Sequence, residues 1–257
     1  MKAKTPSIRA SESKHWYTRD GEPMYTVPSK KDGSPRTTTL RDARELNLVP
    51  SVTTILGMAA KPALIAWMQT QVLMASLTLP RKPEETEEEY IKRIIHDSKQ
   101  ECKSAADRGT DIHESIQGFY EGKGYGNHPK EVAAAAAKIH EKYGDQPWVA
   151  ERAFCHDFGF GGKCDLHSLN GGGIVVDIKT KDFVDEDDVI GYDEHMMQLA
   201  AYRVGLGIPD AVCSNVFVSR NVPGLAVVYE WTEEELKKGW EMFYHLLKFW
   251  QAKTGHK

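Results

Sequence analysis

The sequence lacks any long apolar run. None of its 257 residues lie in a stretch that approaches the roughly 20 apolar residues needed to cross a bilayer. The start of the chain, from Met1 to Trp16, is polar and basic and has no apolar segment of the kind that a secretory signal requires. We therefore expect a cytoplasmic protein without a membrane partner.

Cysteine is scarce and scattered. The four cysteines, Cys102, Cys155, Cys164 and Cys213, form no Cys-x-x-Cys pair. We expect a reducing compartment and mostly buried thiols, because free cysteine packs as a small apolar residue. An iron–sulfur site that unites four widely separated cysteines is the alternative.

The sequence also lacks a large excess of charge of either sign. It has 33 Lys and Arg against 37 Asp and Glu, a net charge of −4, with acidic runs at 84–89 and 182–188. Because nucleic acids respond to local charge, this balance neither supports nor excludes a nucleic-acid partner. No Walker phosphate loop (GxxxxGK[ST]) is present, so the chain contains no nucleotide-driven motor of that kind.

The order of predicted elements indicates an α/β core that follows a helical part, in one compact domain overall. Residues 1–50 are rich in Lys, Arg, Ser, Thr and Pro, which predicts an irregular segment. In residues 51–145 we expect helices from Pro62, from a cap at Thr86, and over Pro129–Tyr143. In residues 146–257 we expect strands at 148–155, 160–169, 174–180, 212–219 and 226–231, with helices at 194–206 and 233–253.

Two acids are predicted to face each other in a hairpin. The strands 160–169 and 174–180 are joined by a glycine-rich turn, and if it centres on Gly171, Asp165 lies opposite Asp177. Directly opposed side chains have Cβ atoms about 5 Å apart, so two carboxylates there repel unless a cation neutralises them. Hard oxygen ligands of this kind suit Mg²⁺ or Mn²⁺.

A lysine belongs to the same predicted strand face. Lys179 follows Asp177 by two residues, which puts both side chains on one side of the strand. An ammonium beside a bound metal can stabilise an attacking water and developing phosphate charge. Asp-x-Lys alone is a weak pattern, and an exposed carboxylate–lysine pair is its alternative interpretation.

Four motifs together resemble the RecB-like branch of the PD-(D/E)XK nucleases. They are Arg108-Gly109-Thr110 through His113, Gly162 through Asp165, Asp177-Ile178-Lys179, and Gln198-Leu199-Ala200-Ala201-Tyr202. That branch includes the RecB and AddAB nuclease domains, CRISPR-associated RecB-like exonucleases and the mitochondrial genome maintenance exonuclease. The match covers roughly residues 51–202, and it implies a restriction-endonuclease-like core, a central mixed sheet flanked by helices.

The resemblance implies a role for each matching residue. The implied metal ligands, for one or two Mg²⁺ or Mn²⁺ ions, are His113, Asp165, Asp177 and the backbone carbonyl of Ile178. The implied catalytic set is Asp165, Asp177, Lys179 and Gln198. Gln198 and Tyr202 are expected to orient the site and hold DNA. Glu151 resembles a supporting acid, with a plain solvent-facing strand residue as its alternative. Several relatives hold an iron–sulfur cluster through C-terminal cysteines, and since none follows Cys213, we expect no cluster.

Taken together, these expectations predict a metal-dependent deoxyribonuclease, specifically an exonuclease that prefers single-stranded DNA ends. We expect it to act in recombination, repair or replication, with a protein of one of these pathways as a candidate partner. If a phage encodes it, we expect it in the host cytoplasm. The alternatives are a structure-specific flap or nicking endonuclease and a catalytically silent DNA-binding module. The presence of Asp165, Asp177 and Lys179 disfavours the silent module. In the RecB-like branch helices often arch over the site, and residues 51–145 are long enough to do so.

Overall fold

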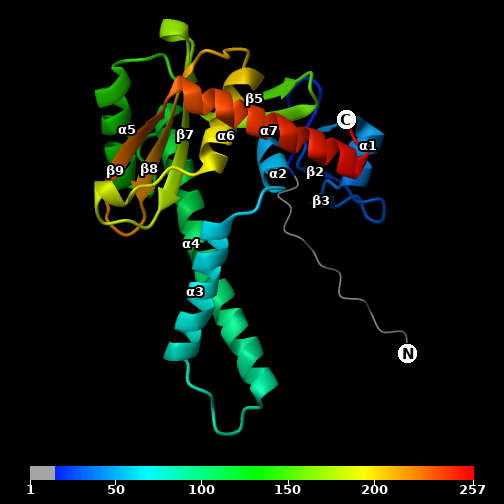
Figure 1. Ribbon diagram of the computed structural model, residues 1–257, viewed down its shortest axis with the longest axis vertical. Helices are drawn as coiled ribbons and strands as arrows, with labels where there is room; N and C mark the ends of the chain where they lie inside the picture. The colour runs from blue at the N-terminus through cyan, green and yellow to red at the C-terminus, as the bar shows by residue number, and fades with distance from the viewer. Residues whose placement is uncertain (1–14) are drawn as a thin grey trace.

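The computed structural model describes residues 15–257; residues 1–14, including the basic start of the chain, lie outside the described part. Figure 1 shows a sheet with helices on both faces and a long helical hairpin that projects from it. Within the described range, no helix has both the length and the apolar composition to span a membrane.

A five-stranded mixed sheet forms the centre of the fold. Its spatial order follows the sequence: β5 (Val149–His156), β6 (Phe160–Ser168), β7 (Ile174–Lys181), β8 (Val212–Ser219) and β9 (Ala226–Trp231). Only the β7–β8 pair within this sheet is parallel, and α6 (Asp193–Gly205) provides the crossover between these strands. This mixed sheet with flanking helices is consistent with the expected restriction-endonuclease-like core.

Helices cover both faces of the sheet. One layer contains α6 and α7 (Glu233–Thr254), and the other contains α4 (Glu87–Tyr120) and α5 (Pro129–Tyr143) (Figure 1). On β7, Val175 packs in the cluster with α6 and α7, whereas Val176 and Ile178 pack in the cluster with α4 and α5. Because strand side chains alternate, Asp177 and Lys179 belong to the α6 side.

The hairpin of β6 and β7 has the predicted register. Leu166 lies opposite Val176 and Ser168 opposite Ile174, and the chain turns through Gly171 at a φ of 62°. A positive φ favours glycine, which has no Cβ to clash. Backbone pairing between β6 and β7 ends at Leu166 and Val176. Asp165 and Asp177 are the next residues along each strand, on the side away from the turn, and the candidate site lies there.

The prediction of an irregular segment up to residue 50 was wrong for its described part. Residues 16–50 form short elements that pack against the core through Trp16 and Leu48, among others. These elements are β1 (Trp16–Tyr17), β2 (Thr26–Pro28), β3 (Pro35–Thr37), α1 (Leu40–Leu46) and β4 (Val49–Pro50). Two antiparallel pairs result, β1 with β4 and β2 with β3.

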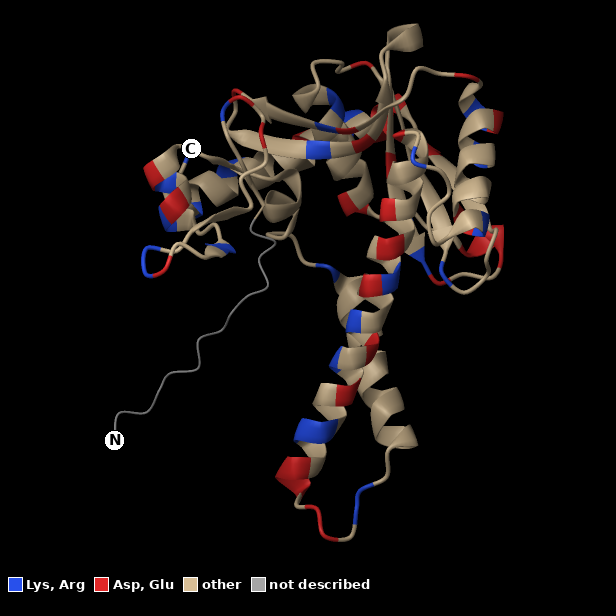
Figure 2. Ribbon diagram, turned by 180° about the vertical axis from the view of Figure 1, so that it is seen from behind, with Lys and Arg blue, Asp and Glu red and all other residues tan. Residues whose placement is uncertain are grey.

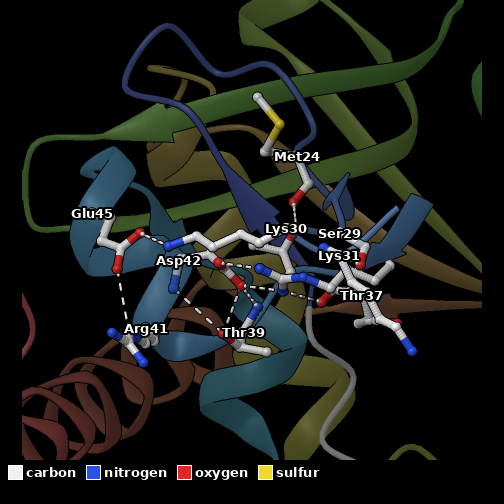
Figure 3. A network of polar contacts seen from close by, with 11 residues as sticks. Met24, Ser29, Lys30, Lys31, Thr37, Thr39, Arg41, Asp42 and Glu45 are labelled. Atoms are coloured by element: carbon white, nitrogen blue, oxygen red, sulfur yellow. Dashed lines mark hydrogen bonds and ion pairs between the residues drawn. The ribbon is translucent and has the colours of Figure 1, made fainter. Parts of the chain in front are cut away.

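Polar pairing explains why this segment is ordered despite its composition. Asp42 accepts two hydrogen bonds from Arg36, at 2.6 and 2.7 Å, and two from the backbone N–H and hydroxyl of Thr39 (Figure 3). Thr39 is the N-cap of α1, so one buried carboxylate joins the helix to β3. Hydrophobic periodicity in the sequence gives no information about polar contacts of this kind, so it did not predict these elements.

A two-helix arm extends from the core. Ser51 caps the short α2 (Val52–Leu56), which is followed by α3 (Pro62–Thr78) and, after a loop, the N-terminal part of α4. Both predicted starts, Pro62 and the cap at Thr86, are confirmed. The hairpin points away from the sheet (Figure 1), so these helices do not form the expected arch.

Candidate active site

A cleft of about 650 Å³ opens between α4 and the ends of the β5, β6 and β7 strands. No residue of α3 lines it. Its polar and charged lining residues include His113, Glu151, Lys163, Asp165, Lys179 and Arg220. Five of the residues named from the sequence therefore line one cavity: His113, Glu151, Asp165, Ile178 and Lys179.

Three side chains in this cleft are arranged as metal ligands would be. A nitrogen of His113 and one carboxylate oxygen each of Glu151 and Asp165 all lie within 4.8 Å of one another. The Nε2 atom of His113 lies 2.9 Å from Oδ2 of Asp165. The carboxylates suit Mg²⁺ or Mn²⁺, and the imidazole favours a transition-metal ion such as Mn²⁺. The donor set therefore fits a divalent cation.

Sheet register explains why Glu151 belongs to this group. Ala150 pairs with Leu166 and Arg152 with Cys164, so Glu151 lies opposite Asp165. Glu151 has a φ of 55°, a left-handed conformation that costs a non-glycine residue about 1 kcal/mol or more and is concentrated at functional sites. Its side chain is only 12% exposed and forms an ion pair with Lys163. The structure thus contradicts the alternative of a plain solvent-facing residue.

Asp177 is held apart from this group. It is 1% exposed, and its Oδ2 atom accepts hydrogen bonds from Nζ of Lys179 at 2.8 Å and from Nδ2 of Asn215 at 2.7 Å. The pKa of Asp177 is raised to about 6, because burial and the neighbouring Asp165 together outweigh the lowering effect of Lys179. Its expected role as a metal ligand stays a prediction, and so does that of the Ile178 carbonyl. The N–H of Ile178 donates to Oδ2 of Asp165 at 2.7 Å.

Lys179, Gln198 and Tyr202 form one hydrogen-bonded chain. Nζ of Lys179 donates to Oε1 of Gln198 at 2.9 Å, and Nε2 of Gln198 donates to the Tyr202 hydroxyl at 2.8 Å. Gln198 and Tyr202 lie one turn apart on α6, and both are buried. Burial supports the expected orienting role of this pair, whereas their contact with DNA stays a prediction.

His113 and Asp165 form a charged pair in the metal-free protein. Burial lowers the pKa of His113, but Asp165, assisted by Asp177 and Glu151, outweighs burial and raises it to about 9. Burial likewise raises the pKa of Asp165, but His113, Lys179 and the N–H of Ile178 outweigh it and hold that pKa below its usual value. A cation that binds here must therefore displace the proton of His113.

Three further residues of the site were missed at the sequence level. Lys163 lies within the Gly162–Asp165 motif, and its spacing of two from Asp165 was the available signal. Asn215 bridges Asp177 to the indole N–H of Trp231, which donates to its Oδ1 at 2.8 Å. Arg220 donates to both carboxylate oxygens of Asp182, at 3.0 and 2.9 Å, and to a backbone carbonyl of α4. Neither Asn215 nor Arg220 belongs to a recognisable pattern in the sequence.

None of the four cysteines lines the cleft, although Cys164 directly precedes Asp165 in β6. Cys164 and Cys213 are buried as expected, whereas Cys102 and Cys155 are partly exposed. Burial raises the pKa of Cys213 to about 12 and that of Cys164 well above its usual value, so these two thiols stay protonated.

The chain matches no protein-family model and no curated protein sequence. It is distantly similar to solved structures. One is a protein from Eubacterium rectale provisionally described as an exonuclease, with 15% identity and a TM-score of 0.40 over 58% of this chain and 69% of that chain. Another is an alkaline exonuclease from Laribacter hongkongensis, with 13% identity and a TM-score of 0.34 over 66% of this chain and 88% of that chain. Similarities this weak leave the function to be argued from the site.

Proposed function

We propose that the chain is a metal-dependent deoxyribonuclease of the PD-(D/E)XK type, in its RecB-like branch, and that it is an exonuclease acting on single-stranded ends. One observation carries the proposal. Metal-ligating atoms of His113, Glu151 and Asp165 converge within 4.8 Å in a cleft that also contains Lys163 and Lys179. Carboxylates can bind the metal ion, and neighbouring cationic side chains can contact the negatively charged phosphodiester.

The ligand side chains have the chemistry for Mg²⁺ or Mn²⁺, and Asp177 is the candidate for an additional ligand. A bound divalent cation supplies a Lewis acid that favours ionisation of water and offsets charge on the phosphate. The α4 helix presents His113, and the adjacent strands present the carboxylates. Ligands from three rigid elements hold their geometry better than ligands from loops.

Lys179 is the residue that acts on the reacting groups. Asp177 and Gln198 accept hydrogen bonds from its ammonium group, which fixes it at the cleft wall with a side chain 26% exposed. Its remaining proton is available to a phosphate oxygen or to the attacking water. Stabilisation of developing negative charge by a fixed donor of this kind contributes several kcal/mol in other enzymes, about 2.7–4 kcal/mol per donor.

The cleft also supplies a route for the DNA backbone. Lys163 and Lys179 line it on the strand side, and Arg220 lines it where β8 ends. Cations that contact phosphates position a nucleic acid without reading its sequence. We propose single-stranded DNA as the substrate and recombination, repair or replication as the setting.

A structure-specific endonuclease is the second candidate, and one observation favours it. The α3–α4 hairpin extends away from the cleft and α3 contributes nothing to its lining, so the helices do not enclose a passage for a threaded strand. An open cleft admits DNA without a free end.

One comparison of substrates tests the proposal. A linear single strand and a covalently closed circle of the same sequence are incubated with the protein in Mg²⁺ or Mn²⁺, with Asp165→Asn and a chelator as controls. We expect metal-dependent loss of the linear strand and little attack on the circle. Equal loss of both substrates rejects the exonuclease and favours the endonuclease. Loss of neither, at any metal concentration, rejects the nuclease and favours a silent DNA-binding module.

A further inference from the structure

The arm carries an apolar surface that its own two helices do not cover. On α3, Ala75 is the only buried residue, and Gln71 and Trp67 are partly buried one and two turns earlier, so a single stripe of the helix packs on α4. The large exposed apolar side chains of α3 are Leu64, Ile65, Met68, Val72, Leu73, Met74 and Leu77. Large exposed apolar surfaces on a soluble protein mark sites of interaction.

The α3 segment also has no charge. From Pro62 to Pro80 the sequence contains no Asp, Glu, Lys or Arg, whereas α4 carries charges of both signs along its length (Figure 2). A helix that is apolar on all sides is characteristically buried on all sides. DNA is a poor occupant for this surface, since there is no cation to contact a phosphate.

The arm is held in a defined shape. At its tip, Arg93 donates to both carboxylate oxygens of Glu85, each at 2.8 Å, and the Tyr90 hydroxyl donates to the carbonyl of Ser76 at 3.1 Å. The first contact joins the loop between α3 and α4 to α4, and the second joins α4 to α3. The apolar surface is therefore presented by a structured hairpin and is suited to docking without a large ordering cost.

We infer that the arm is a self-association surface, on which α3 of one chain packs against the arm of a second copy. Around a two-fold axis each residue near the axis meets the same residue of the partner, so a charge there would face its own copy. The uncharged α3 satisfies this requirement along its whole length. A different partner would be selected by a charge or pocket on α3, and α3 offers no charge for such selection.

The dimensions of the arm also suit a second copy. Two such hairpins combine into a four-helix bundle, in which each α3 is covered by its own α4 and by the two helices of the other arm. Exposed Ile91 and Ile95, on the α4 part of the arm, extend the apolar surface. A stable interface engages roughly 20–30 residues a side, which α3 and the projecting part of α4 can provide together.

The test is the mass of the full chain in solution, measured by sedimentation velocity and light scattering between about 1 and 100 µM without DNA. We expect twice the monomer mass of 28.9 kDa. The double variant Leu73→Glu/Leu77→Glu should be monomeric, because both side chains are among the most exposed of the arm and their replacement removes no internal packing. The matched control Leu169→Glu/Val184→Glu changes two equally exposed residues outside the arm and should stay dimeric.

Each contrary result overturns the inference. A monomeric wild-type chain at 100 µM means that the arm does not bind a second copy. A dimer that persists in the arm variant, with an unchanged melting temperature, places the interface elsewhere. Because mass is measured without DNA, these outcomes are independent of nuclease activity, which the arm variant should retain on short oligonucleotides.

Discussion

Lys179 on β7 donates a hydrogen bond to Gln198 on α6 across 2.9 Å, and the same ammonium group contacts Asp177 at 2.8 Å. One acceptor, Asp177, is on β7 and the other, Gln198, is on the crossover helix α6. The packing of α6 against the sheet therefore determines where the ammonium group lies. The buried Tyr202 hydroxyl in turn accepts a hydrogen bond from Nε2 of Gln198. The catalytic proposal for Lys179 rests on this fixed position.

We predict that Lys179→Ala reduces the cleavage rate by about 100-fold or more while Mn²⁺ binding is largely retained, because Lys179 acts on the transition state and not on the cation. Gln198→Ala should reduce the rate less, by about tenfold, because Asp177 still holds the ammonium. Single-turnover kinetics with Mn²⁺ calorimetry measure both effects. An unchanged rate in Lys179→Ala would make the lysine an ordinary strand residue.

The two neighbouring acids should affect stability in opposite directions. Asp177→Asn removes a carboxyl whose pKa is raised by burial, so its ionisation at pH 7 opposes folding and the variant should melt at the same or a higher temperature. Asp165→Asn removes an ionised group that His113 and the Ile178 N–H stabilise, so its melting temperature should fall by roughly 2–5 °C. Both variants should lose cleavage.

Melting curves at pH 7 and a nuclease assay on the same preparations decide this. Normal turnover in either variant would remove that acid from the site. A lower melting temperature in both variants would mean that Asp177 is stabilising as a charged group, and that Lys179 and Asn215 overcome its burial.

His113→Ala should weaken Mn²⁺ binding by at least about tenfold and should be partly rescued by a higher Mn²⁺ concentration, as loss of a ligand is and a folding defect is not. Because the pKa of His113 is raised to about 9, the wild-type affinity should also rise with pH until His113 is neutral near pH 9. This rise should be smaller in the variant. Asp111→Ala, an exposed acid on the same helix, is the control. Identical Mn²⁺ isotherms for wild type and His113→Ala would exclude His113 as a ligand.

Local patterns in the sequence predicted the core of the fold well. The strands β8 and β9 have the expected bounds, and the register of the β6–β7 hairpin, with Leu166 opposite Val176, follows from one glycine-rich turn. Both depend on periodicity and turn chemistry, which neighbouring residues determine. The convergence of Asp165 with neighbouring polar residues near this hairpin was therefore predictable.

The composition of the site was less predictable, because it depends on contacts across the sheet. Asn215 reaches Asp177 only because β8 lies parallel to β7, and the left-handed backbone of Glu151 has no signal in the strand pattern. The direction of the α3–α4 hairpin was also not encoded in its helical periodicity. Each of these features is determined by tertiary packing, which overrides local preference.

Lys163→Ala should raise KM for DNA several-fold and leave kcat within about threefold, because the lysine is suited to hold a phosphate away from the reacting bond. Loss of one phosphate contact should also reduce the salt dependence of binding by about one counterion. Lys163 forms an ion pair with Glu151, so its removal should leave Mn²⁺ affinity unchanged or improve it. Lys237→Ala, an exposed lysine on α7, is the control. A fall in kcat with unchanged KM would place Lys163 in the chemical step.

The last prediction concerns acid stability and His195, on α6. Burial, assisted by the nearby cations Lys179, Lys61 and Lys181, lowers the pKa of His195 to about 3. Its Nδ1 atom accepts a hydrogen bond from the N–H of Tyr192 at 3.4 Å, which requires a neutral ring.

As the pH falls from about 6.5 toward 3, the unfolded state protonates this histidine and the folded state does not, so the free energy of unfolding decreases over that range. The loss is on the order of 2–4 kcal/mol over that range. His195→Asn keeps an acceptor for Tyr192 but cannot bind a proton, so its melting temperature should fall less steeply than that of the wild type between pH 6.5 and 4.

The comparison uses the slope of melting temperature against pH. The substitution also removes ring packing against Phe217, which lowers stability at every pH and so does not change that slope. Thermal melts at half-unit intervals of pH, with His245→Asn as an exposed histidine control on α7, give the comparison. Parallel curves for wild type and His195→Asn would mean that His195 takes up a proton equally in the folded and unfolded states. Burial would then impose no penalty on its charge, and the acid sensitivity of the fold would arise from its carboxylates.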